Sequence, residues 1–155
     1  MDCNLLSLPI LYLSRFIIQN KSKYYELLLN VTKDEDWRAW VMFMLQAVKN
    51  TSEWTISKIT AIKSLHEHTI EYIKTHADKI YTRELVDTIF EQPYSRITNL
   101  VDKNIAKRQA ASTYLKKLVE IGVLHELQLG KEKLFIHPKL LRLLQDDSNQ
   151  FIPYE

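Results

Sequence analysis

The longest regular pattern of apolar and polar residues lies between Asp34 and Ala77. Apolar or small residues recur there every three or four positions, and neither glycine nor proline interrupts the segment. This is the period of an amphipathic α-helix, so the pattern predicts one helix of about forty residues or two nearly continuous ones. A helix of that length needs neighbouring helices or another chain to cover its apolar stripe.

Two shorter helices are predicted before it. The first runs from Ser7, as N-cap, to about Gln19, with Pro9 in its first turn, where the missing N–H costs nothing. It is apolar on most faces, so we expect it to be deeply buried and any exposed part to drive association. The second begins at Ser22 and continues through Val31. Residues 1–79 are therefore predicted to form a helical bundle segment.

Short helices replace long ones after Ala77. The first of them is predicted from Thr82, as cap, to Phe90, and the second from a cap at Ser95 to about Asn104. The third runs from about Ala106 to Gly122, which ends it. Two extended runs, 123–129 and 132–137, flank Gly130-Lys131 and predict a β-hairpin.

Three short helices followed by a hairpin are typical of a winged helix-turn-helix. The predicted fold class is therefore mainly α: the helical bundle segment, then a winged helix-turn-helix with a small β-hairpin over residues 80–144. Residues 138–144 are expected to form a last short helix. The tail, residues 145–155, is polar and acidic and is expected to be loose.

The third short helix of this predicted domain has two distinct faces. Ala111, Leu115 and Leu118 follow one another at helical spacing and should point inward. The opposite face and the predicted hairpin carry basic, amide and hydroxyl side chains, which read base edges and bind phosphates in DNA-binding helices and wings. The candidate DNA-binding residues are Lys107, Arg108, Gln109, Ser112, Thr113 and Lys116 on the helix, with Lys131 and Lys133 on the hairpin.

A charged helix face is often only solvated, and winged helices also serve as protein–protein modules. The acidic residues Glu120, Glu126 and Glu132 lie close by in the sequence and weaken a positive field. The three tryptophans, Trp37, Trp40 and Trp54, stand at helical spacing and are interpreted as helix packing rather than as a stacking platform for bases.

Composition adds few constraints. The 155 residues carry a net charge of +2, but residues 80–142 hold eleven basic and seven acidic residues, a net of +4. The single cysteine, Cys3, rules out an intrachain disulfide and a cysteine-rich zinc site. Two isolated glycines cannot build a phosphate-binding loop. No long apolar run or signal-peptide pattern occurs, so we expect a cytoplasmic chain without a membrane partner.

The histidines do not predict a metal site. His66 and His68 are two residues apart, which on a helix separates them by about 200°. His76, His125 and His137 have no carboxylate or histidine at ligand spacing. No nucleophile and base stand in a recognisable context either, so we expect no metal, no cofactor and no catalytic residue.

Several segments resemble the C-terminal part of bacterial Fic-family proteins: Leu8 to Ile17, the helix with Trp37 and Trp40, Arg83 to Ile97, and Ile105 to Leu124. Fic proteins are protein AMP-transferases, and one large group carries a winged-helix domain after its catalytic helices. The family's active site has the form H-x-F-x-x-G-N-G-R and lies just upstream of the first of these segments. That motif does not occur in the 155 residues, so the resemblance supplies no catalytic residue.

The sequence thus predicts a non-catalytic regulatory module whose winged helix binds double-stranded DNA. The competing hypothesis is a protein-interaction module, in which the winged helix or the helical segment contacts a protein or a second copy of the chain. Transfer of AMP from ATP to a hydroxyl side chain is implied only for a full-length parent protein.

Overall fold

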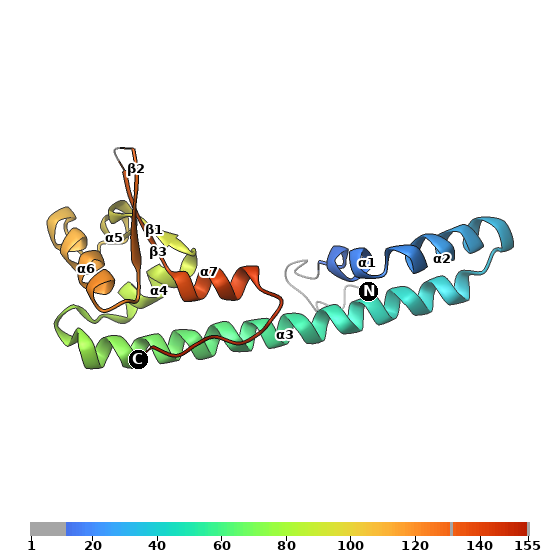
Figure 1. Ribbon diagram of the computed structural model, residues 1–155, viewed down its shortest axis with the longest axis horizontal. Coiled ribbons are helices and arrows are strands. Elements are labelled where there is room, and N and C mark those ends of the chain that lie inside the picture. The colour runs from blue at the N-terminus through green and yellow to red at the C-terminus, as the bar shows by residue number, and fades with distance from the viewer. Residues whose placement is uncertain (1–11, 131, 155) are drawn as a thin grey trace. The chain divides into compact units, whose positions relative to one another are not determined.

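The computed structural model describes residues 12–130 and 132–154, and they are mainly α-helical with one small antiparallel sheet (Figure 1). The predicted fold class is confirmed in this respect. The chain divides into two compact units between Ser57 and Lys58, and each unit is described by itself. The long helix α3, Trp37–His76, contributes residues to both units and is one continuous helix, as the pattern predicts.

In the first unit, α1 (Ser14–Gln19) and α2 (Lys21–Asp34) precede the start of α3. Aromatic rings hold the three helices together: Phe16 of α1 lies 5.3 Å from Phe43 of α3, and Tyr24 of α2 lies 5.1 Å from Trp40, both between ring centroids. α2 ends at Glu35, whose φ of 55° is left-handed and reverses the chain into α3.

Two predictions for this unit need correction. The helix predicted from Ser7 to Gln19 ends where expected, but its first residues lie outside the described residues, and no residue of α1 is buried. Ile18 is 72% exposed, because the unit packs only one side of this two-turn helix. Trp37 is 61% exposed as well, so only Trp40 and Trp54 act as packing residues: the Arg15 guanidinium lies 4.4 Å from the ring of Trp54.

The second unit contains the predicted short helices and hairpin. Its chain order agrees with the order expected of a winged helix-turn-helix, and the hairpin of β2 and β3 projects from the helices (Figure 1). A short 3-10 helix, Asp78–Ile80, follows α3, and the remaining elements are α4 (Arg83–Glu91), β1 (Tyr94–Ser95), α5 (Ile97–Asp102), α6 (Arg108–Glu120), β2 (His125–Leu129), β3 (Glu132–Ile136) and α7 (Pro138–Gln145).

The sheet has a strand that the sequence did not predict. Its order is β1-β3-β2, with every pair antiparallel. Ser95, expected to cap a helix, instead lies in β1 and pairs with Phe135 of β3. Arg96 is the residue that precedes α5. A two-residue strand after Pro93 has no alternating pattern to reveal it. Thr82, by contrast, caps α4 as predicted, since its hydroxyl accepts the Leu85 N–H at 3.1 Å.

One apolar core joins these elements. The predicted inward stripe of α6 is confirmed, because Ala111, Leu115 and Leu118 have no exposed surface. They pack with buried residues of α4, α5, β3 and the end of α3. Gly122 follows α6 with a φ of 75°, the left-handed geometry that ends a helix before an extended strand.

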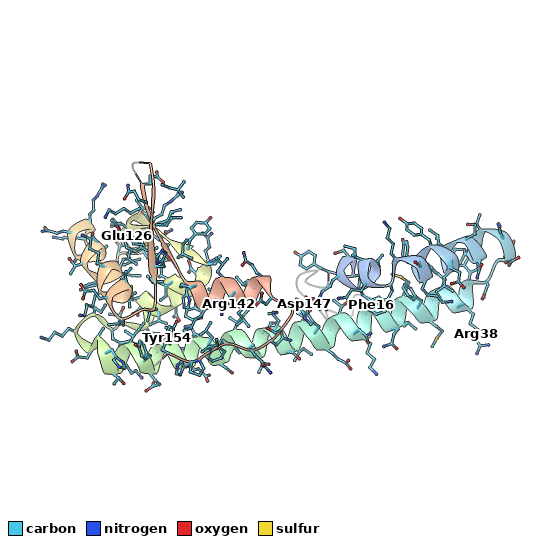
Figure 2. All side chains as sticks on the ribbon, viewed as in Figure 1. Phe16, Arg38, Glu126, Arg142, Asp147 and Tyr154 are labelled. Atoms are coloured by element: carbon cyan, nitrogen blue, oxygen red, sulfur yellow. The ribbon has the colours of Figure 1, made fainter. Side chains whose placement is uncertain are left out.

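The tail is packed, so the prediction of a loose tail is wrong for residues 146–154. The ring of Tyr154 stacks on that of Tyr72 in α3 at 4.7 Å between centroids. Figure 2 shows Tyr154 beside α3. The buried ammonium of Lys58 donates to the carbonyls of Leu143, Asp146 and Ser148 at 2.7–3.1 Å. Composition alone suggested disorder, but these partners lie more than eighty residues away in sequence.

His137 joins α7 to this tail. Its Nδ1 accepts the Leu140 N–H at 3.2 Å, so the neutral ring carries its proton on Nε2, which faces the Tyr154 hydroxyl at 3.4 Å. Burial, helped by the nearby Lys139 charge, lowers the pKa of His137 from 6.5 to about 4. Burial also raises the pKa of Tyr154 to about 12, so both groups stay neutral in the folded chain near pH 7.

Two neighbouring leucines of α7 provide a matched test of this packing. Leu143 is 1% exposed and Leu144 is 47% exposed. Leu143→Ala should lower the free energy of unfolding by about 2–5 kcal/mol, as for other buried leucines, and Leu144→Ala by well under half of that. Urea unfolding should be followed by far-UV circular dichroism, because all three tryptophans lie in the first unit. Equal losses in the two variants would contradict the assigned burial.

The low pKa of His137 predicts a loss of stability in acid. Between pH 6.5 and 4 the unfolded chain binds a proton at this ring that the folded chain does not, so stability falls as the pH falls. From pH 7 to pH 5 the loss from this group is about 2 kcal/mol. His137→Asn keeps an acceptor for the Leu140 N–H but cannot titrate, so its unfolding free energy should depend less on pH. The same pH dependence in both proteins would contradict the prediction.

Candidate nucleic-acid interface

The exposed face of α6 carries the candidate residues that the sequence indicated. Lys107 is the N-cap, with extended backbone, and Arg108 begins the helix. Ser112 is half-buried, and the other candidates on this helix are exposed: Lys107, Arg108, Gln109, Thr113 and Lys116. The inward stripe on the opposite side of α6 fixes this orientation.

These side chains differ in what they can still bind. The Thr113 hydroxyl donates to the Gln109 carbonyl at 3.1 Å, so its proton is used within the helix and its methyl group and oxygen lone pair remain. Among the described residues, Arg108 has neither a hydrogen bond nor an ion pair from its side chain. The guanidinium therefore keeps all of its donors available to a ligand.

The hairpin supplies fewer free charges than expected. Lys133, on β3, forms an ion pair with Glu126 of β2. Lys131 lies outside the described residues, so the structure does not test its predicted phosphate contact. Glu132 begins β3 and is 3.4 Å from the Nη2 of Arg96. The acidic residues that weakened the predicted field thus pair directly with basic ones.

A groove joins α5, the start of α6 and β3. Its volume is about 550 Å³. The residues that line it are Arg96, Ile97, Thr98, Val101, Arg108, Glu132 and Lys133. Arg96 and Thr98 were not among the candidates, because they precede or begin a different helix and come together with Arg108 only through the packing of α5 against α6.

The three histidines of α3 have structural partners. His66 Nε2 lies 2.8 Å from Asp87 Oδ1, whereas His68 Nε2 accepts the Tyr154 N–H at 2.9 Å, so the two rings face different elements. His76 Nδ1 lies 2.9 Å from the Tyr72 carbonyl. Within residues 12–130 and 132–154, no three His, Cys, Asp or Glu side chains gather closely enough to hold a metal ion.

Residues 65–140 match the family model for the C-terminal domain of SoFic-like protein adenylyltransferases. We refer to this part of the chain as the SoFic-like domain, after the family model that it matches. The resemblance to the C-terminal part of Fic-family proteins is thereby confirmed over these residues. The SoFic-like domain includes α4, α5, α6 and the sheet, and so contains the whole groove.

Two of the resembling segments, Leu8 to Ile17 and the helix start at Trp37 and Trp40, lie outside the matched residues. The matched family is named for protein adenylyltransferases, and the match covers its C-terminal domain only. In the described parts of the chain, no helix combines the length and apolar composition needed to cross a bilayer.

Proposed function

We propose that the SoFic-like domain is a winged helix-turn-helix that binds duplex DNA and acts as a regulatory module without catalysis of its own. The observation that supports this best is the position of Arg108. It stands at the exposed start of α6 and also lines the groove that includes Arg96 and Lys133. Three basic side chains from three elements thus serve one surface, as contacts along a phosphate backbone require.

On this proposal, the basic and the neutral polar side chains of the α6 face have different roles in binding DNA. Lys107, Arg108 and Lys116 contact phosphates or guanine edges, since guanidinium and ammonium groups only donate. Gln109, Ser112 and Thr113 choose among bases, with the Thr113 methyl suited to the methyl group of thymine. Lys131 and Lys133 of the hairpin contact the backbone and position the domain without reading sequence.

The absence of catalysis is part of the same proposal. The motif H-x-F-x-x-G-N-G-R does not occur in the 155 residues, whose two glycines, Gly122 and Gly130, both serve turns. AMP transfer, the activity named for the family, would need that nucleotide site from elsewhere.

A second candidate function is self-association or protein binding through the first unit. Large apolar side chains are exposed on its helices, among them Ile18 of α1, Tyr25 and Leu29 of α2, and Met42 and Leu45 of α3. Exposed apolar surface of this kind favours association. Sedimentation of the full chain over a range of concentrations tests it, and a strictly monomeric chain would count against it.

Charge reversal at Arg108 tests DNA binding. Arg108→Glu removes an attraction to phosphate and adds a repulsion, so binding of duplex DNA should weaken at least about tenfold, within the 1–3 kcal/mol of a good bidentate contact. The salt dependence should also flatten by about one unit of log-log slope for each phosphate that the variant no longer neutralises. Fluorescence anisotropy at several salt concentrations measures both quantities.

Arg83→Glu is the matched control. Arg83 is exposed on α4, outside the groove and α6, and carries the same charge change. It should leave binding within about twofold of wild type at 0.15 M salt, where charges beyond about 8 Å are screened. Wild-type binding without salt dependence, or equal effects of the two reversals, would refute the DNA proposal and favour the protein-interaction function.

A further inference from the structure

The groove beside α6 contains an acidic side chain where a DNA-binding surface should be basic. Glu132 lines the groove together with Arg96, Arg108 and Lys133. Its Oε2 lies 3.4 Å from Arg96 Nη2, so the Glu132 carboxylate and the Arg96 guanidinium form an ion pair in the free chain. The groove therefore already holds an anion, supplied by the domain itself.

The two acidic residues near this surface are not equivalent. In the Arg96–Glu132 pair the side chains are 51% and 66% exposed, whereas in the Lys133–Glu126 pair they are 40% and 27% exposed. Exposed ion pairs are weak, since water solvates both partners well. Both residues are paired in the hairpin, but Glu126 lies within β2, across from Phe135, whereas Glu132 is the first residue of β3, across from Leu129. Of the two carboxylates, that of Glu132 is the one that a competing anion replaces easily.

The remaining walls of the groove fit a nucleic-acid backbone better than a free anion. Ile97 and Val101 of α5 give it an apolar side, which suits the carbon face of a deoxyribose. The Thr98 hydroxyl adds a neutral donor, and Arg108 adds a second guanidinium from another helix. Guanidinium groups bind carboxylate and phosphate oxygens in the same bidentate geometry, so one can replace the other.

We propose that this groove holds a backbone phosphate of duplex DNA between Arg96 and Arg108, and that Glu132 stays ion-paired with Arg96 until the phosphate displaces its carboxylate. This inference rests on the proposed function and extends it to Arg96 and Glu132, which lie outside α6. Glu132 is then a competitor within the domain: it lowers the affinity for any DNA that does not place a phosphate in the groove.

Neutralising Glu132 tests the competition. Glu132→Gln should strengthen binding of duplex DNA about threefold or more at 0.15 M salt, because it removes a close repulsion and frees Arg96. The matched control is Glu71→Gln, which removes an exposed, ion-paired carboxylate from α3, outside the groove. It should change binding less than about twofold, since its charge is screened. Far-UV circular dichroism confirms that each variant is folded.

Arg96→Ala tests the contact itself. It should weaken wild-type binding and reduce the log-log salt slope by about one unit. In the double variant Arg96→Ala/Glu132→Gln, the gain from the glutamine should be smaller than in the wild-type background, because no guanidinium is left to be freed. A non-additive result of this sign supports displacement at Arg96.

The other outcomes overturn the inference in distinguishable ways. If Arg108→Glu abolishes salt-dependent binding but Glu132→Gln equals Glu71→Gln, DNA binding stands and the competition is wrong. If Glu132→Gln raises the affinity for duplex DNA equally with and without Arg96, Glu132 acts only through its net charge, and the proposed phosphate contact at Arg96 is wrong. If neither wild type nor Glu132→Gln binds duplex DNA, the inference and the proposed function fall together.

Discussion

The burial of one face of α6 is the constraint on which the rest of the SoFic-like domain depends. Ala111, Leu115 and Leu118 lie wholly in the core, in contact with residues from α4, α5 and β3. Rotating the helix to expose this stripe would cost several kcal/mol for the two leucines alone, about 1.5–3 kcal/mol each. The side chains on the other face are therefore held toward solvent without any polar contact being needed to orient them.

The sheet register makes a second element available to the same surface. β1 pairs with the end of β3, Tyr94 with Ile136 and Ser95 with Phe135. Continued by one residue, this antiparallel register directs Arg96 toward the start of β3, where Glu132 lies. A strand of two residues contributes little stability of its own, but it determines which charges meet in the groove.

The sequence was sufficient for features that depend on neighbouring residues. The long helix α3, the Thr82 cap, the α6 stripe and the stop at Gly122 follow from helical period and capping chemistry, and all were found as predicted. The features that it missed arise from distant contacts: β1 from pairing with β3, the packed tail from Lys58 and Tyr72, and Arg96 from the approach of α5 to α6. Acidic composition marked the tail as loose because composition does not register partners elsewhere in the chain.

Because the interface depends on contacts between distant residues, a net charge of +4 over residues 80–142 describes it poorly. Summed charge treats Arg96 and Glu132 as cancelling, and Lys133 and Glu126 likewise, whereas the structure shows which pairs are exposed. An exposed pair exchanges its carboxylate for a phosphate at little cost, but only where the phosphate arrives at the position of that carboxylate. If the groove binds DNA as proposed, its paired charges therefore favour a ligand of defined geometry over a general polyanion. Arg108 has no acidic partner among the described residues, so its charge attracts both kinds of ligand to the surface.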